Sequence, residues 1–242
     1  MKIYITTSDK YCHVCPISVE FLNRYWPNQD IVILGYDGVK AYKDMPENVE
    51  VVSLGDQDSF GKTWTDALIP YFEKVEDDYF VVLCEDLILM GDVDLNIMQK
   101  IEQKIKEGKA EKAMIGGGIP LNRTSEYEDG LVVFDQDVDY RLSLHPAIWK
   151  KEYFLKYLRP SMTCWQFELT DNSKAKNDGA RIIAHKYSFP EQPHLFSNLN
   201  LYHGGKIMLN EDATIRDNQP GKRHFLQEDL KYIRKTIEIG GI

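Results

Sequence analysis

Two adjacent carboxylates inside an almost unbroken apolar stretch constrain the fold of this chain more than any other feature. Residues 79–94 read YFVVLCEDLILMGDVD, with Glu85 and Asp86 between two apolar runs. Such a run is typical of a strand buried on both faces, as in a parallel sheet. Because buried carboxylates are costly unless paired or metal-bound, we expect both acids at the carboxyl end of that strand, where open α/β sheets bind ligands. The alternative is a structural pair that caps a helix or pairs with a lysine.

Apolar runs and helical patterns alternate through the first half of the chain. The predicted strands are residues 2–6, 31–36, 49–54, 79–84 and 113–116, and the predicted helices are residues 16–26, 64–75 and 94–108. In the last of these helices, Asp94 is the expected N-cap and Gly108 the expected end. This alternation predicts an α/β fold with a mostly parallel, doubly wound sheet flanked by helices.

The rhythm changes after Gly118. We expect a hairpin of residues 131–134 and 140–144, a helix over 146–158, a late strand over 181–185 and a terminal helix over 226–237. No stretch has the composition of a linker, so the sequence predicts a single domain over residues 1–242, divided into a first half, 1–118, and a more irregular second half, 119–242.

Composition excludes several classes of protein. With 43% hydrophobic and 12% aromatic residues the chain can form a packed core, and a formal net charge of −9 disfavours broad adhesion to nucleic acid or anionic membranes. No apolar stretch is long enough to span a bilayer, and the first residues turn polar too early for a signal peptide. We therefore expect a cytoplasmic protein without an integral membrane segment.

Four cysteines stand at positions 12, 15, 84 and 164. Cys12 and Cys15 have CxxC spacing, but a zinc site of that type needs a second ligand pair, and there is no second CxxC. Cys84 lies inside the apolar run and resembles a small buried hydrophobe. Reduced structural thiols are the expectation, with zinc or redox chemistry as the alternative.

Six ordered segments resemble a known family. They are YWP at 25–27, ILGY at 33–36, GKTWTDAL at 61–68, DDYFVVLCED at 77–86, SLHPAIWKK at 143–151 and CWQFE at 164–168. Together, over roughly residues 2–210, they look like small GT-A-type glycosyltransferases of bacteria and their viruses. The resemblance implies a GT-A-like, Rossmann-like sheet, with a nucleotide-sugar-binding half (1–118), a smaller irregular acceptor half (119–242) and use of Mn²⁺ or Mg²⁺.

The resemblance also implies a donor site at the ends of the first strands. The residues it assigns to the nucleotide-sugar are Thr6, Thr7, Asp9, Lys62, Asp66, Glu85, Asp86 and Lys206. Cys84 stands where the usual DxD pattern has an acid, so Asp86, which matches the last position of that pattern, is the stronger metal ligand of the two acids. His203 is the second expected metal ligand; a lone histidine is otherwise structural or exposed.

On the acceptor side, the resemblance assigns catalysis to Glu168, which would take the proton of the acceptor hydroxyl if the reaction inverts the anomeric centre. Asp135 and Asp137 are next in line for this role. Trp149 and Trp165 are the expected sugar-stacking faces. The structural alternatives are a Glu168 carboxylate paired with a lysine, and tryptophans that only pack.

The sequence therefore predicts a metal-dependent glycosyltransferase that moves a sugar from a nucleotide-sugar to an acceptor hydroxyl. The acceptor is a glycan, a protein or a modified base in DNA, and the acidic charge makes DNA the least suited. A nucleotidyltransferase is the alternative enzyme, although residues 7–10, TSDK, lack the glycines of its first loop. A non-catalytic carbohydrate-binding relative is the other alternative. Donor sugar, stereochemistry and oligomeric state stay open.

Overall fold

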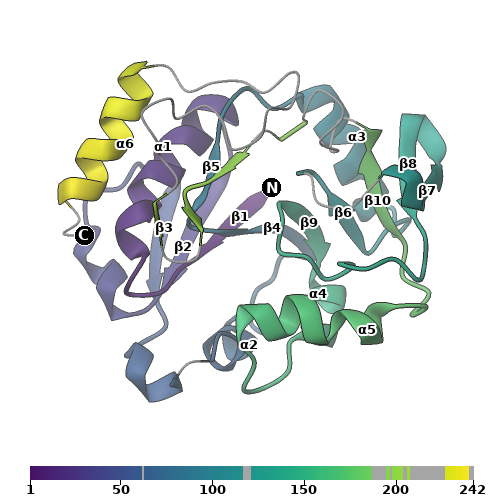
Figure 1. Cartoon of the computed structure of the whole chain (residues 1–242), viewed down its shortest axis with the longest axis horizontal. Helices are drawn as coiled ribbons and strands as arrows, with labels where there is room; N and C mark the ends of the chain where they lie inside the picture. The colour runs from purple at the N-terminus through teal and green to yellow at the C-terminus, as the bar shows by residue number, and fades with distance from the viewer. Residues whose placement is uncertain are drawn as a thin grey trace.

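A nine-stranded mixed sheet forms the centre of the molecule (Figure 1). The computed structural model describes residues 1–61, 63–116, 121–186, 195–196, 198–203, 206–207 and 227–239. The strands of this sheet are β1 (Lys2–Thr6), β2 (Asp30–Gly35), β3 (Val49–Ser53), β4 (Tyr79–Cys84), β6 (Lys112–Met114), β7 (Thr124–Glu126), β8 (Leu131–Phe134), β9 (Ala147–Lys150) and β10 (Ile182–His185).

The strand order is β3-β2-β1-β4-β9-β6-β10-β8-β7. Strands β3, β2, β1 and β4 are parallel neighbours, and β6 and β10 form another parallel pair. Strand β9 is antiparallel to both β4 and β6, and β8 is antiparallel to β10 and β7. Only β9 and β8 thus run against the common direction, so the prediction of a mostly parallel α/β sheet is confirmed.

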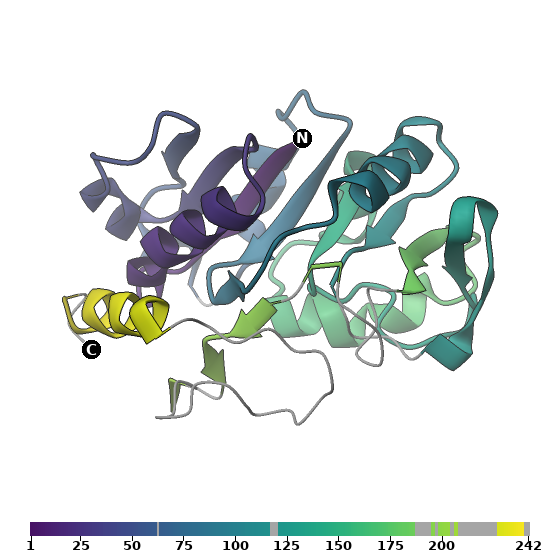
Figure 2. The same ribbon diagram turned by 90° about the horizontal axis from the view of Figure 1, so that it is seen from above.

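Helices cover both faces of the sheet (Figures 1 and 2). One face packs against α1 (Cys15–Tyr25), α3 (Leu95–Lys106) and α6 (Gln227–Ile239), and the other against α2 (Thr65–Phe72), α4 (Lys151–Tyr157) and the short α5 (Asn172–Ala175). No helix among the described residues is long and apolar enough to cross a bilayer.

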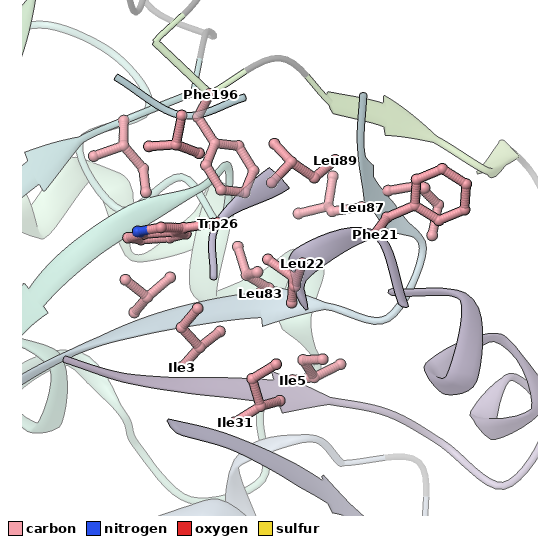
Figure 3. Packing of buried hydrophobic residues seen from close by; sticks show 14 of the residues in the cluster. Ile3, Ile5, Phe21, Leu22, Trp26, Ile31, Leu83, Leu87, Leu89 and Phe196 are labelled. Carbon is pink, nitrogen blue, oxygen red and sulfur yellow. The ribbon is translucent and has the colours of Figure 1, made fainter. Parts of the chain in front are cut away.

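Alternating side chains of the central strands feed two hydrophobic clusters. In β1, Ile3 and Ile5 belong to one cluster and Tyr4 to the other. Strands β2 and β4 follow the same alternation, as expected for strands buried on both faces. Figure 3 shows the first cluster, with labels on Ile3, Ile5, Phe21, Leu22, Trp26, Ile31, Leu83, Leu87, Leu89 and Phe196.

Two short ladders lie outside the large sheet. Strand β5 (Leu87–Leu89), directly after the two acids, pairs antiparallel with β11 (Asn198–Asn200). Strand β12 (Tyr202–His203) pairs with β13 (Lys206–Ile207). The first ladder brings a distant part of the chain beside the end of β4.

The predicted elements of the first half are confirmed, but two predictions for the second half are wrong. Residues 140–144 are not a strand: Tyr140 has a φ of 61°, and the segment turns, while β8 pairs with β7 and β10 instead. The predicted helix over 146–158 starts only at Lys151. The residues before it form β9, because their apolar side chains fill the gap between β4 and β6 and are fully buried.

Strands from both predicted halves interleave in the one sheet, since β9 from the second half lies between β4 and β6 from the first. The division of residues 1–242 at position 118 stays a prediction.

The N-cap of α3 gives a test of how local sequence sets this fold. The Asp94 carboxylate accepts hydrogen bonds from the amides of Asn96 (3.0 Å) and Ile97 (3.1 Å). We expect Asp94→Ala to lower the free energy of unfolding by about 1 kcal/mol, because it leaves these amides without their acceptor. Asp94→Asn should lower it much less, since asparagine also caps. Urea denaturation measures both, and an equal loss in the two variants contradicts the capping role.

Candidate functional site

A cleft of about 530 Å³ opens at the carboxyl ends of β1, β2 and β4, where α/β sheets bind ligands. Its walls come from the segments that follow these strands, from the start of α2, from the segment before Gln166 and from residue 202. The lining residues are Thr6, Thr7, Ser8, Tyr11, Tyr36, Gln57, Thr63, Trp64, Cys84, Glu85, Asp86, Thr163, Cys164, Trp165 and Tyr202.

A second cavity, of about 610 Å³, lies at the opposite end of β1 and is lined by Lys2, Tyr4 and Asp77 among others. Three of its ionisable groups pair with one another: Lys2 Nζ lies 3.0 Å from the Asp77 carboxylate, and the Tyr4 hydroxyl donates to the same group at 3.3 Å. Although larger, this cavity lies at the amino end of β1, away from the edge of the sheet where α/β folds bind ligands.

Glu85 and Asp86 lie in the cleft, where the apolar run of β4 ends. Burial, and then the neighbouring Asp86 charge, raise the pKa of Glu85 to about 8. Burial also raises the pKa of Asp86, while its own amide and that of Tyr202, by hydrogen bonding, act in the opposite direction. Both carboxyls are thus held where their negative charge is poorly compensated by the protein, which is the condition for binding a cation.

Residues 198–203 lie beside Asp86. The Leu201 amide donates to the Asp86 carbonyl at 2.8 Å, continuing the β5–β11 ladder. The Tyr202 hydroxyl lies 3.1 Å from His13 Nε2, and the Tyr202 ring packs on Tyr11 with ring centres 5.1 Å apart. The Tyr202 amide is hydrogen-bonded to the Asp86 carboxylate, and His203, a predicted metal ligand, is the next residue in the chain.

Three of the predicted site side chains lie outside the described part of the structure. Lys62 is not described, and for His203 and Lys206 only the backbone is described, in β12 and β13. Their assignments stay predictions.

Thr6 and Thr7 both line the cleft and are almost fully buried. Asp9 lies outside the cleft lining. Its carboxylate accepts from the Gly38 amide at 2.7 Å, and its own amide donates to the cleft residue Gln57 at 2.8 Å. Asp9 thus joins the loops after β1 and β2 to the loop before α2.

Asp66, in the first turn of α2, is also occupied by protein contacts. Its carboxylate accepts from the Ser161 amide at 2.6 Å and from the Thr63 hydroxyl at 2.9 Å. The Trp64 amide donates to the Met162 carbonyl at 2.7 Å. These bonds fix the start of α2 to the segment that leads into residues 163–165, so two walls of the cleft are joined.

The two predicted sugar-stacking tryptophans lie in different environments. Trp165 lines the cleft and is 66% exposed. Trp149 is fully buried in β9, with Lys112 Nζ 3.8 Å from the centre of its ring. The structure corrects the prediction for Trp149: its ring is part of the core and has no face for a sugar, because β9 lies inside the sheet rather than at the start of a helix.

Glu168 lies on the helical segment Gln166–Thr170, one turn after Trp165. Its Oε1 accepts from the Ser143 hydroxyl and from the Leu144 amide, both at 2.9 Å. It is not itself part of the cleft lining, but its charge acts on Cys84 and Cys164, which are, and contributes to the raised pKa of both thiols. Asp135 and Asp137 instead form ion pairs with Arg123, at 3.0 and 2.6 Å.

All four cysteines are free thiols at or beside this cleft. Cys84 and Cys164 line it, and burial raises the pKa of Cys15, with the Glu85 charge adding to the effect. Among the residues that the structure describes, no group of three or more His, Cys, Asp and Glu side chains is arranged to hold a metal ion.

Sequence reasoning missed several lining residues, above all Tyr11, Tyr36, Gln57 and Tyr202. Tyr11 and Tyr36 follow the ends of β1 and β2, so the position of the strands could have indicated them. Tyr202 directly precedes His203, a predicted metal ligand, and the pairing of β11 with β5 brings this segment to the cleft.

The raised pKa of Glu85 predicts a pH dependence of stability in the absence of divalent cations. With a pKa of about 8 folded and 4.5 unfolded, the folded chain keeps a proton that the unfolded chain releases between these values. The free energy of unfolding should therefore fall with rising pH in this window, by up to about 1.4 kcal/mol per pH unit.

Glu85→Gln removes this contribution. Urea denaturation between pH 5 and pH 8, within that window, should show the difference between Glu85→Gln and the parent growing with pH, whereas Glu73→Gln, at an exposed position, should follow the parent. A pH-independent difference for Glu85→Gln contradicts the analysis.

Comparisons with protein-family models and with curated proteins return no match. Solved structures are similar in fold. Mannosyltransferase PcManGT from Pyrobaculum calidifontis, in complex with GDP-Man and Mn²⁺, has a TM-score of 0.53 at 9% identity, and the match covers 78% of this chain and 55% of that one.

Two further structures are more distant. S. aureus TarS 1–349 has a TM-score of 0.49 at 12% identity, with 76% of this chain and 57% of that chain covered. A cytidylyltransferase from Leptospira borgpetersenii has a TM-score of 0.48 at 12% identity, with 82% and 80% covered. This chain spans little more than half of PcManGT and of the TarS chain. The similarity to PcManGT shows the fold: as expected from the sequence, the chain has a GT-A-like α/β fold.

Proposed function

We propose that this protein is a metal-dependent glycosyltransferase that moves a sugar from a nucleotide-sugar to an acceptor hydroxyl. The observation that carries the proposal is the pair Glu85 and Asp86, at the carboxyl end of the central strand β4, facing a cleft in a GT-A-like sheet. PcManGT, of similar fold, is in complex with GDP-Man and Mn²⁺.

The residues of the cleft fit a divalent cation. Burial raises the pKa of both Glu85 and Asp86, and no cationic side chain among the described residues lines the cleft to offset their charge. Mg²⁺ and Mn²⁺ prefer carboxylate and phosphate oxygens, and bind through few protein ligands when phosphates supply the others. Asp86 would hold the ion with the donor diphosphate, and His203 is the second candidate. When bound, the ion stabilises the charge of the departing diphosphate.

The remaining cleft residues would hold the donor. We assign Thr6, the last residue of β1, and Thr7, the residue after it, to the nucleotide; both side chains are buried. We assign Lys62 and Lys206 to the diphosphate. Asp9 and Asp66 would act by holding the loops around the donor, because both carboxylates already accept hydrogen bonds from backbone amides. This pattern supports a preformed donor site.

On the acceptor side, Trp165 offers an exposed indole at the edge of the cleft. An aromatic face of this kind packs well on the apolar face of a sugar ring. Glu168, one turn further on, is the group we assign as the base that takes the proton of the attacking hydroxyl if the anomeric centre is inverted. A glycan is the acceptor that these two residues fit most directly.

A nucleotidyltransferase would use the same edge of a similar sheet. It differs in substrate, since it takes a nucleoside triphosphate and releases pyrophosphate. Incubation with CTP, UTP or GTP and a sugar phosphate, followed by assay of pyrophosphate, separates the two activities. The proposed glycosyltransferase releases none.

Asp86→Asn tests the proposed function. We expect Mn²⁺ together with UDP or GDP to raise the melting temperature of the parent by about 5 °C or more at ligand well above Kd. The variant should lose the Mn²⁺-dependent part, because its amide cannot supply a charged oxygen ligand. Differential scanning fluorimetry with and without Mn²⁺ measures the effect.

Asp78→Asn is the matched control. It makes the same change of charge directly before β4, at the opposite end of that strand, where the side chain is exposed. Mn²⁺ together with UDP or GDP should raise the melting temperature of Asp78→Asn as much as that of the parent. If Asp86→Asn is stabilised by Mn²⁺ and diphosphate as strongly as the parent, the assignment of the metal site is wrong.

A further inference from the structure

A buried polar network lies directly behind Glu168. Ser143, 1% exposed, donates its hydroxyl to Glu168 Oε1, and the next amide, of Leu144, donates to the same oxygen. Two donors on one carboxylate oxygen fix the orientation of the group. The structure shows no hydrogen bond to Oε2 from any residue that it describes.

Lys112 holds Ser143 from the other side. This lysine, in β6, is fully buried, and its Nζ donates to the Ser143 carbonyl at 2.7 Å and to the Arg141 carbonyl at 3.0 Å. Burial lowers the pKa of Lys112 well below its usual range. A neutral amine still has two N–H groups, which match the two carbonyls, so Lys112 can hold this turn in either charge state.

Arg141 anchors the start of the same turn. Its side chain is fully buried and donates to the carbonyls of Ala175 (2.7 Å) and Ala180 (2.6 Å), while its amide donates to Asn172 Oδ1 at 2.6 Å. Residues 141–144 are thus held by β6 on one side and by the region of α5 on the other. A buried network with its polar groups satisfied rigidifies the backbone that carries it.

We propose that Ser143 is a positioning residue for Glu168, and that Lys112 acts through Ser143 to hold the carboxylate at the acceptor side of the cleft with Oε2 available to the acceptor. The inference rests on the proposed function, in which Glu168 is the base. It adds that the geometry of this base is set by a turn, residues 141–144, that is not part of the cleft lining.

Four titratable groups face Glu168 from the elements packed around it. They are Lys112 from β6, His145 from the turn before β9, Cys84 at the end of β4 and Cys164 on its own segment. Burial lowers the pKa of His145, and the Glu168 charge opposes this shift. Variants are therefore compared at one fixed pH, which avoids changes in the charge of these neighbours.

The Leu144 amide provides a readout that needs no turnover. Because this N–H donates to Glu168 Oε1, its rate of exchange with deuterium, followed in ¹H–¹⁵N spectra at one fixed pH, reports how firmly the carboxylate is held. Glu168→Ala, which has no acceptor, gives the rate of the free amide.

In Ser143→Ala, we expect the Leu144 amide to exchange about tenfold faster than in the parent, because the carboxylate that accepts from it loses one of its two donors. Ser143→Cys, with a weaker donor, should lie between Ser143→Ala and the parent. Ser173→Ala is the matched control: its hydroxyl donates to the Thr170 carbonyl at 3.1 Å, near Glu168 but not on it, and the Leu144 amide should exchange as in the parent.

Turnover provides the second readout. With Mn²⁺ and either UDP-N-acetylglucosamine or GDP-mannose, whichever stabilises the parent, water serves as the acceptor and the release of nucleoside diphosphate is measured at one fixed pH. Ser143→Ala should lower kcat about tenfold or more, with KM for the donor unchanged, and Ser143→Cys should recover part of that loss. Lys112→Met should act in the same direction, because the carbonyl of Ser143 loses its anchor.

An unchanged exchange rate of the Leu144 amide in Ser143→Ala overturns the proposal, as does an unchanged kcat in Ser143→Ala when Glu168→Gln is slow. A parent that neither binds Mn²⁺ with a diphosphate nor releases one from either donor overturns the proposed function. The exchange of the Leu144 amide then still decides whether Ser143 holds Glu168, so the two failures are distinguishable.

Discussion

The structure depends on two neighbouring acids placed where a fully buried strand ends. Strand β4 lies between β1 and β9 and is covered on both faces, so its side chains must be apolar until the chain leaves the sheet. Glu85 and Asp86 come at that point and lose much of their contact with water, which raises the pKa of both. Among the residues that the structure describes, no cationic side chain lines the cleft, and a bound cation would offset the charge of the two acids.

The second half of the chain completes the site by inserting elements around the same strand. Strand β9 pairs with β4, and β11 pairs with β5 immediately after the acids. The pairing of β9 with β4 buries Trp149, and β9 follows the turn whose Leu144 amide donates to Glu168. The pairing of β11 with β5 brings Tyr202 to Asp86. The groups that we propose for the donor and the acceptor thus come from segments far apart in sequence that pair with one central region.

The sequence predicted the secondary structure best where one hydrophobic period extends over a whole strand or helix. The strands and helices of the first half, the cap at Asp94 and the position of the two acids all follow from apolar periodicity and capping residues. Strand β9 did not, because three apolar residues and a lysine before a helix fit a helix equally well until the gap between β4 and β6 is known. Trp149 was misplaced for the same reason, since residue type alone does not separate a core indole from an exposed one.

The polar network behind Glu168 could not be predicted for a different physical reason. Lys112 is one of several lysines in a charged stretch, and nothing in its neighbours indicates that it enters the sheet fully buried. Its role depends on two carbonyls about thirty residues away, presented by a turn that the sequence pattern favoured as a strand. Hydrogen bonds between distant backbone and side-chain atoms leave no local signal in the sequence.

The location of a bound metal ion tests this account most directly. Crystals grown with Mn²⁺ and UDP or GDP, measured at a wavelength where manganese scatters anomalously, show the ion without assumptions about the acceptor. The account predicts a single strong peak within coordination distance of the Asp86 carboxylate, with the diphosphate beside it in the cleft. A nucleotide bound in the cavity near Lys2 and Asp77, or in the cleft with no manganese at Asp86, would contradict it.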